Sequence, residues 1–114
     1  MTADGAREWV SPHYNSPGII FVLNASFGEP GVFVTVQFFT DMGKQLDELT
    51  QLVPAGTAHP FVSHVGGESA HNWVKITAKG EVFPWGITPV SALYGEEEHG
   101  FAPMTFYRLE PKRR

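Results

Sequence analysis

Five histidines are the residues in this chain best suited to bind a metal ion. Three of them, His59, His64 and His71, are close in sequence, and Glu68 lies between the last two. Imidazole nitrogen and carboxylate oxygen are both ligands of borderline metals such as zinc. Their spacing matches no established ligand motif, so we interpret them as histidines of surface loops and predict no metal site and no cofactor.

Serine and histidine also stand close together in two places, which is the pairing that nucleophilic catalysis uses. Ser63 directly precedes His64, and Ser69 shortly precedes His71. A triad also needs a residue that orients the base and an oxyanion hole, and the chain has no Gly-x-Ser-x-Gly or phosphate-loop motif. Glycoside hydrolysis requires two carboxylates on opposite sides of a cleft. The glutamates at 96–98 are instead adjacent in the sequence. We predict that the chain is not an enzyme.

Aromatic residues offer a third kind of chemistry, because sugars bind against flat rings that have hydrogen-bonding side chains beside them. Several aromatics lie near the ends of predicted strands or in predicted loops. The tryptophans are equally typical of a core or a subunit interface, where they bury a large apolar area. The candidate ligand-binding residues are Trp73, Trp85, Tyr94, Tyr14 and His13.

The composition predicts one folded domain over residues 1–114, since 42% of the residues are hydrophobic and only 18% are charged. Twelve glycines and nine prolines leave little room for long helices and favour short strands. The formal net charge of −4 gives no cationic surface for a phosphate backbone, so we expect no nucleic acid partner. The lack of cysteine excludes disulfides and thiol nucleophiles.

The first residues have neither the basic start nor the apolar segment of a secretory signal. The longest apolar run, residues 19–23, is far shorter than the roughly 18 residues that predict a membrane span. We therefore expect a soluble chain with no membrane span, cytoplasmic by default.

Residues 19–40 are the most strongly patterned stretch, two apolar runs separated by turn residues, which predicts a β-hairpin or a sandwich corner. Residues 19–25 are apolar at every position up to Asn24, as expected for a strand covered on both faces. In the second run the alternation places Val32, Val34, Val36 and Phe38 in the core. Phe33 and Phe39 then face elsewhere, toward a partner.

Further strands are predicted at residues 7–10, 45–53, 58–62, 73–78, 81–88 and 104–109, with loops at 11–18, 63–72 and 89–103. The leucines of residues 45–53 also keep helical spacing, which leaves a helix as an alternative. Lys79 and Gly80 are typical of a two-residue hairpin, and Pro84 indicates an edge position or a bulge. Seven or eight short strands predict an all-β fold, a single antiparallel β-sandwich of immunoglobulin-like or jelly-roll-like type.

The order of four segments carries a resemblance to a known family: Trp9, the sequence VLNA at 22–25, VTVQFFTD at 34–41 and LVPAGT at 52–57. This progression resembles the sensory rhodopsin transducer family and related small bacterial immunoglobulin-like domains, over roughly residues 9–62. The resemblance implies a β-sandwich that forms symmetric homo-oligomers and acts by binding. It assigns no functional residue, because the matching positions are those of core and turn residues.

The surplus of aromatic residues over the needs of one small core predicts exposed apolar patches, which tend to be interfaces. We therefore expect a non-enzymatic, self-associating β-sandwich module that serves as a structural, adaptor or assembly component. The alternative is a carbohydrate-binding module. The expected partner is a second copy of the chain, another protein or a glycan, and the candidate interface residues are Phe33, Phe39 and Phe83.

Overall fold

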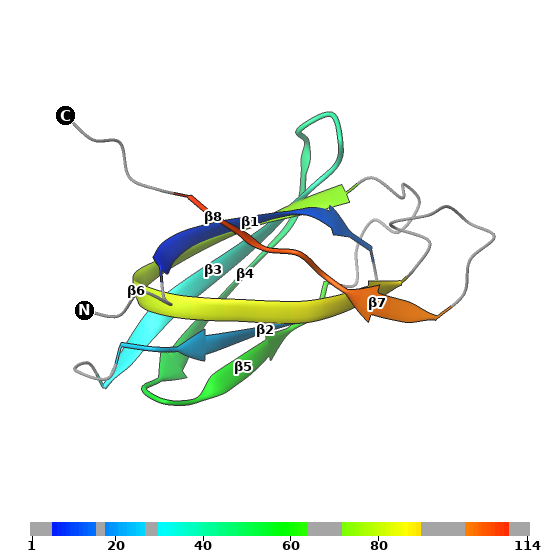
Figure 1. The fold of residues 1–114 in the computed structure, drawn as a ribbon. Helices are drawn as coiled ribbons and strands as arrows, with labels where there is room; N and C mark the ends of the chain where they lie inside the picture. Colours follow the sequence, from blue (N-terminus) through cyan, green and yellow to red (C-terminus); the bar gives the residue numbers. More distant parts are fainter. Residues whose placement is uncertain (1–5, 16–17, 27–29, 64–71, 90–99, 110–114) are drawn as a thin grey trace.

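The computed structural model describes residues 6–15, 18–26, 30–63, 72–89 and 100–109, and these form eight β-strands and no helix (Figure 1). The predicted all-β fold is confirmed. Since no helix forms in this part of the chain, none there could cross a membrane. The strands are β1 Ala6–Tyr14, β2 Ile19–Asn24, β3 Gly31–Phe39, β4 Gln45–Pro54, β5 Ala58–Phe61, β6 Asn72–Pro89, β7 Phe101–Pro103 and β8 Tyr107–Arg108.

The long strand β6 belongs to both layers of the fold. Its first half, up to residue 78, pairs with β3 and with most of β1, and its second half, from residue 82, pairs with β2 and β7; Ala6 at the start of β1 also pairs with Val82. The first sheet therefore has the order β4-β3-β6-β1-β8, and the second has the order β5-β2-β6-β7. Figure 1 shows β6 crossing the molecule as one curved ribbon. Every pairing is antiparallel, as predicted for the sandwich.

The two-residue hairpin predicted at Lys79 and Gly80 is wrong, because β6 continues through both residues. The even-numbered residues from 72 to 88 are all buried, so inward and outward side chains alternate without interruption along β6, including the bend between its two halves (Figure 1). Gly80 makes the bend possible. A Cβ atom there would lie 2.6 Å from Ser26 Oγ and 2.8 Å from Val32 Cγ1, which is closer than packed atoms approach.

Residues 19–40 form a sandwich corner rather than a hairpin, since β2 and β3 pair with opposite halves of β6 and not with each other. The predicted core face of β3 is confirmed, with its valines and Phe38 at most 4% exposed. In β2 only Ile20, Val22 and Asn24 are buried, while the alternate residues are partly exposed. The prediction that β2 is covered on both faces is wrong, because no described layer packs on its outer face.

Three other boundaries differ from the prediction. Strand β1 extends through Tyr14, because Ser11 and Tyr14 pair with Val74 and Asn72, so the loop predicted from residue 11 begins later. Strand β7 lies inside the loop predicted at 89–103 and pairs with the end of β6. Of the strand predicted at 104–109, only β8 forms. Residues 45–53 are strand, as predicted, and the turn before them has Gly43 at φ +89°.

Pro84 lies within β6 without weakening the sheet. In an antiparallel ladder, residue pairs that exchange backbone hydrogen bonds alternate with pairs that exchange none. Ala25 N–H donates a bond of 3.0 Å to Glu81 C=O, so the bonded pairs of β2 and β6 are those of the odd-numbered residues. Pro84 stands opposite Val22 in a pair that makes no ladder bonds, so its missing N–H would have pointed toward β7. Strand β7 reaches back only to Ile87. The predicted edge character of Pro84 is therefore confirmed on this side.

Candidate functional site

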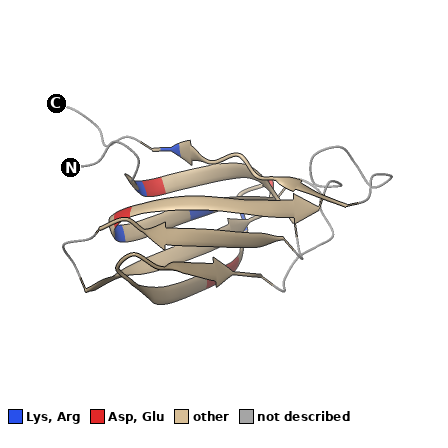
Figure 2. Ribbon diagram, turned by 60° about the horizontal axis from the view of Figure 1, so that its bottom comes forward, with Lys and Arg blue, Asp and Glu red and all other residues tan. Residues whose placement is uncertain are grey.

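Residues 83–87 of β6 and the strands β2, β5 and β7 form an outer face of the second sheet made of apolar side chains, and we call it the apolar face; Glu81 of β6 lies at its margin. The alternation of each strand directs one set of residues into the core and the other set outward. In Figure 2 the ribbons of β2, β5 and β7 carry no charged residue. The members are Ile19, Phe21, Leu23, Ala58, Pro60, Phe83, Trp85, Ile87, Phe101 and Pro103.

Register brings the aromatic members of this face together. Phe21 of β2 stands opposite Trp85 of β6, and their rings stack with centroids 5.6 Å apart and planes 17° from parallel. Leu23 stands opposite Phe83 in the same way. Cross-strand pairs of this kind stabilise a sheet while leaving one side of each ring in solvent. They build a continuous aromatic and aliphatic surface.

The exposure of this surface is high for side chains of this type. Phe83 is 42% exposed, Trp85 43%, Ile87 40% and Phe101 52%. Since a large aromatic side chain offers about 150–250 Å², the whole face exposes on the order of 500 Å². That lies at the upper end of the roughly 300–600 Å² of the largest patch on an ordinary monomer. The apolar face is thus as large as the largest apolar patches of ordinary monomers.

The outer face of the first sheet has a different chemistry. Thr35 and Thr50 stand opposite each other with their hydroxyl oxygens 3.0 Å apart, and Gln37 donates a hydrogen bond of 3.0 Å to Gln45. Lys75 of β6 pairs with Gln37 on the same face. Such mixed polar residues are what a sheet face in contact with water normally carries. This face therefore mixes polar groups with its apolar residues, whereas the apolar face has apolar members throughout.

The predicted site residues divide between the two sheets. Trp85 and Phe83 lie on the apolar face, whereas Trp73 and Phe39 stack on each other at 4.3 Å on the outer face of the first sheet. Phe33 is 54% exposed on that same face, opposite Leu52. The structure therefore separates these residues into two surfaces. Tyr94 lies outside the described residues.

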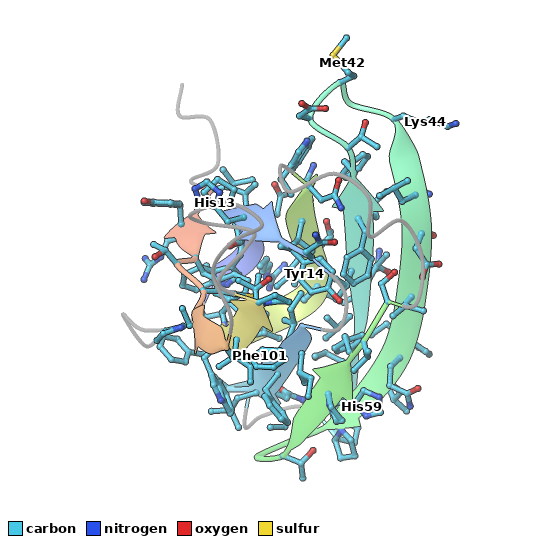
Figure 3. The ribbon with its side chains drawn as sticks, turned by 90° about the vertical axis from the view of Figure 1, so that its right-hand side faces the viewer. His13, Tyr14, Met42, Lys44, His59 and Phe101 are labelled. Carbon is cyan, nitrogen blue, oxygen red and sulfur yellow. The ribbon has the colours of Figure 1, made fainter. Side chains whose placement is uncertain are left out.

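Tyr14 is buried, which corrects its prediction as a ligand-binding residue. Its ring packs on Phe38 at 4.9 Å, and its hydroxyl donates to Gly18 C=O at 2.9 Å and accepts from Ser63 N–H at 3.3 Å. Burial raises the pKa of the Tyr14 phenol, and this outweighs the Ser63 hydrogen bond, which lowers it. Figure 3 shows Tyr14 between the two layers. It offers no surface to a ligand.

The histidines give no common site in the described part of the chain. His59 on β5 packs edge-on against Phe61, with centroids 5.0 Å apart. His13 is half-buried near the end of β1, where its Nδ1 is buried and has no hydrogen-bond partner among the described residues. Within those residues no three histidines or carboxylates gather closely enough to hold a metal ion. His64, Glu68 and His71 lie outside the described residues, so the expectation that they belong to a surface loop and bind no metal stays a prediction.

The candidate site residues predicted from the sequence include only Phe83 and Trp85 of the ten members of the apolar face. Ile19, Phe21 and Leu23 were assigned to a fully covered strand, and Phe101 and Pro103 to a loop. The residue types of β2 could have indicated this face. Both alternating sets of residues 19–23 are apolar, but only one set of a strand can point into the core of a two-layer fold. The second set therefore needs another apolar surface to cover it.

Comparison with known proteins shows a likeness in fold. The structure is similar to the Anabaena sensory rhodopsin transducer, with a TM-score of 0.58 and 14% identity over 75% of this chain and 99% of that one. It is also similar to the crystal structure of Thermotoga maritima 1070, with a TM-score of 0.58 and 10% identity over 95% and 98% of the two chains. No family model and no curated protein matches the sequence. The resemblance expected from the sequence is confirmed at the level of the fold.

Proposed function

We propose that this chain is a non-enzymatic binding module that associates with a second copy of itself through the apolar face. The observation that carries the proposal is the exposure of Phe83, Trp85, Ile87 and Phe101 side by side on one layer. Water in contact with such a surface is unfavourable, and covering it with a matching surface is the main driving force of protein association. The name of the Anabaena protein, a transducer, also favours a binding role over a catalytic one.

A second copy fits the chemistry of this face better than a charged partner does. The chain carries a formal charge of −4, yet the described apolar face has no charged member, so two copies meet there without repulsion between like charges. A twofold interface brings the same patch of each subunit together. One partner of a stable interface contributes about 800 Å², so the apolar face supplies more than half of this from its centre.

The molar mass in solution tests this proposal. Multi-angle light scattering after size-exclusion chromatography should give a mass of at least twice the 12.6 kDa of one chain. The variant Trp85→Lys places a charge at the centre of the apolar face and should lower the mass to that of a monomer. Because Trp85 points outward and is 43% exposed, the fold should tolerate lysine there.

Phe33→Lys is the matched control, since Phe33 is also aromatic and is 54% exposed but lies on the outer face of the first sheet. This variant should keep the mass of the wild-type assembly. A wild-type chain that stays monomeric at about 1 mM, a concentration at which even weak complexes form, would refute self-association. Dissociation by Phe33→Lys with no effect of Trp85→Lys would move the interface to the other sheet.

A second candidate function, the binding of a glycan, is favoured by the surroundings of Trp73. The stacked pair of Trp73 and Phe39 shares the outer face of the first sheet with Gln37 and Lys75, so rings and hydrogen-bonding groups lie together. This combination is typical of sugar sites, whereas Trp85 has only apolar neighbours. A glycan array should detect binding that Trp73→Ala abolishes and Trp85→Ala leaves intact. An array without saturable binding removes this candidate.

A further inference from the structure

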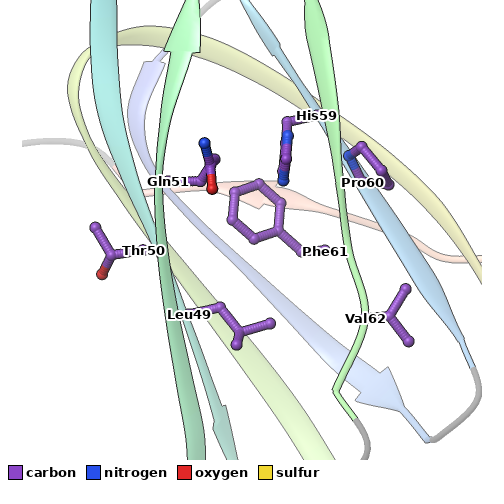
Figure 4. Close-up of a pocket in the computed structure, with 7 residues that line it drawn as sticks. All are labelled: Leu49, Thr50, Gln51, His59, Pro60, Phe61 and Val62. Carbon is purple, nitrogen blue, oxygen red and sulfur yellow. The ribbon is translucent and has the colours of Figure 1, made fainter.

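The side of the sandwich between β4 and β5 holds an open cavity of about 330 Å³ (Figure 4). Strand β4 is the edge of the first sheet and β5 is the edge of the second, so the cavity separates two strand edges. Its volume falls in the range of pockets that bind small molecules or single side chains of a partner. The lining residues are Leu49, Thr50, Gln51, His59, Pro60, Phe61 and Val62.

The backbone of β4 presents unpaired ladder groups toward this side. Ala55 N–H bonds to Pro30 C=O at 3.2 Å just beyond the β3–β4 pairing, and this bond fixes the phase of the ladder. Because bonded and non-bonded pairs alternate, the odd-numbered residues of 47–53 direct their N–H and C=O groups to β3. The even-numbered residues of 48–52 direct theirs outward, away from the sheet.

Two side-chain hydrogen bonds are consistent with this phase. Glu48 N–H donates to Asp47 Oδ1 at 2.8 Å, and Gln51 Nε2 donates to Leu52 C=O at 3.3 Å, so both outward groups are met by a neighbouring side chain. Between them, Thr50 N–H and C=O have no partner in the described part of the chain. An edge strand of ten residues with such groups is a template for another strand.

The side chains of β4 set the chemistry of a strand added to it. Leu49 and Gln51 point to the interior and line the cavity, with Phe61 behind them, so a residue placed beside Leu49 would enter an apolar space. Glu48 points to the outer face and accepts long hydrogen bonds of 3.4 Å from two neutral amides. A cationic side chain placed beside Glu48 would pair with it.

We propose that the edge of β4 binds an extended peptide segment of a partner protein as an additional strand. The segment has one apolar side chain, which fills the cavity beside Leu49, and a lysine or arginine at the next position, beside Glu48. Backbone bonds to Thr50 supply affinity, and the two side chains supply specificity, which is how strand addition works elsewhere. The site shares only Pro60 with the apolar face and does not depend on self-association.

A labelled peptide tests the proposal directly. The probe is fluorescein-Gly-Thr-Val-Thr-Leu-Lys-Gly-amide, in which leucine stands beside Leu49 and lysine beside Glu48 in an antiparallel addition. Fluorescence anisotropy should show saturable binding, and amide shifts in the spectrum of ¹⁵N-labelled protein should concentrate at residues 48–52 and at Phe61. The variant Thr50→Pro, which removes the outward N–H, should weaken binding at least tenfold, while Thr50→Val should stay within twofold.

Three further results decide the outcome. A probe with an N-methyl group on its central threonine should bind at least tenfold more weakly, since that threonine pairs with Thr50. Binding should persist in Trp85→Lys, which separates this site from self-association through the apolar face. The proposal is overturned by an absence of saturable binding, by equal binding of the N-methylated probe, or by a Thr50→Pro chain that has lost the mass of the assembly, since a second copy then occupies this edge.

Discussion

The side-chain amide of Asn24 donates a hydrogen bond of 2.8 Å to the backbone C=O of Val53, which joins the end of β2 in one sheet to the end of β4 in the other. The side-chain oxygen of the same residue accepts a bond of 2.7 Å from Ser26 N–H. Its backbone bonds to Gly56 and Thr57 in the turn that follows β4. One fully buried asparagine thus holds the corner of the sandwich.

Asn24→Ala should lower the free energy of unfolding by roughly 2–4 kcal/mol, because it removes the bond between the two sheets at the buried Val53 C=O and leaves Ser26 N–H without its acceptor. Urea unfolding followed by tryptophan fluorescence measures this. Thr57→Ala is the control, since its exposed hydroxyl bond to Pro54 C=O at 2.8 Å lies in the same corner and should contribute less than about 1 kcal/mol. Equal losses in the two variants would show that Asn24 is not the link between the sheets.

The hydrogen bonds of Asn24 give a structural reason for two of the segments on which the resemblance in sequence rests. The segments LNA, at 23–25, and VPA, at 53–55, are far apart in the chain, yet the Asn24 to Val53 hydrogen bond connects them. Both are positions of structure rather than of function. The sequence could therefore predict the sandwich and its likeness to solved folds, but these positions could not predict a ligand or a partner.

The alternation of apolar residues predicted correctly which residues face the core, whereas the sequence did not predict which strands pair. The core face of β3, from Val32 to Phe38, follows from residue types alone. The split of β6 at Lys79 was predicted from local turn chemistry, although the shared phase of Ala78, Gly80 and Val82 already favoured a continuous strand. The apolar face required knowing that β2 pairs with β5 and β6, and no local pattern contains that.

Tyr14 should make stability depend on alkaline pH. Its pKa is raised in the folded state by burial, so the neutral phenol contributes fully below the unfolded pKa of about 10 and this contribution is lost as the pH rises through the folded pKa. Tyr14→Phe should cost roughly 1–3 kcal/mol at neutral pH, because Gly18 C=O loses its donor. The free energy of unfolding should then fall less steeply above pH ~10 in this variant than in the wild type. Parallel slopes would show that another group causes the alkaline loss.

Gly80→Ala should destabilise the bend in β6. The added methyl group would meet Ser26 Oγ at 2.6 Å and Val32 Cγ1 at 2.8 Å, so the corner must open, at a cost of about 1–3 kcal/mol. The neighbouring variant Lys79→Ala changes an exposed side chain and should stay within about 0.5 kcal/mol of the wild type. Thermal unfolding of the two variants side by side gives the comparison, and a Gly80→Ala chain as stable as Lys79→Ala would contradict the close packing at the bend.

Proline placed at two adjacent residues of β4 should lower the free energy of unfolding by very different amounts. In the ladder phase set by the Ala55 to Pro30 bond, Gln51 N–H points into the sheet toward Val34, whereas Thr50 N–H points outward. Gln51→Pro removes a ladder bond and should cost about 3 kcal/mol or more, while Thr50→Pro removes no ladder bond, only the exposed bond between the Thr35 and Thr50 hydroxyls, and should cost about 1 kcal/mol. Urea unfolding measures both. Because proline also restricts the residue before it to extended conformations, which both positions already have, the difference between the variants reports the hydrogen bond itself. A larger cost for Thr50→Pro than for Gln51→Pro would place the unpaired groups of β4 at the odd-numbered residues, and the peptide segment would then have to bind one residue out of the proposed register. Equal costs would contradict the alternation on which the site rests.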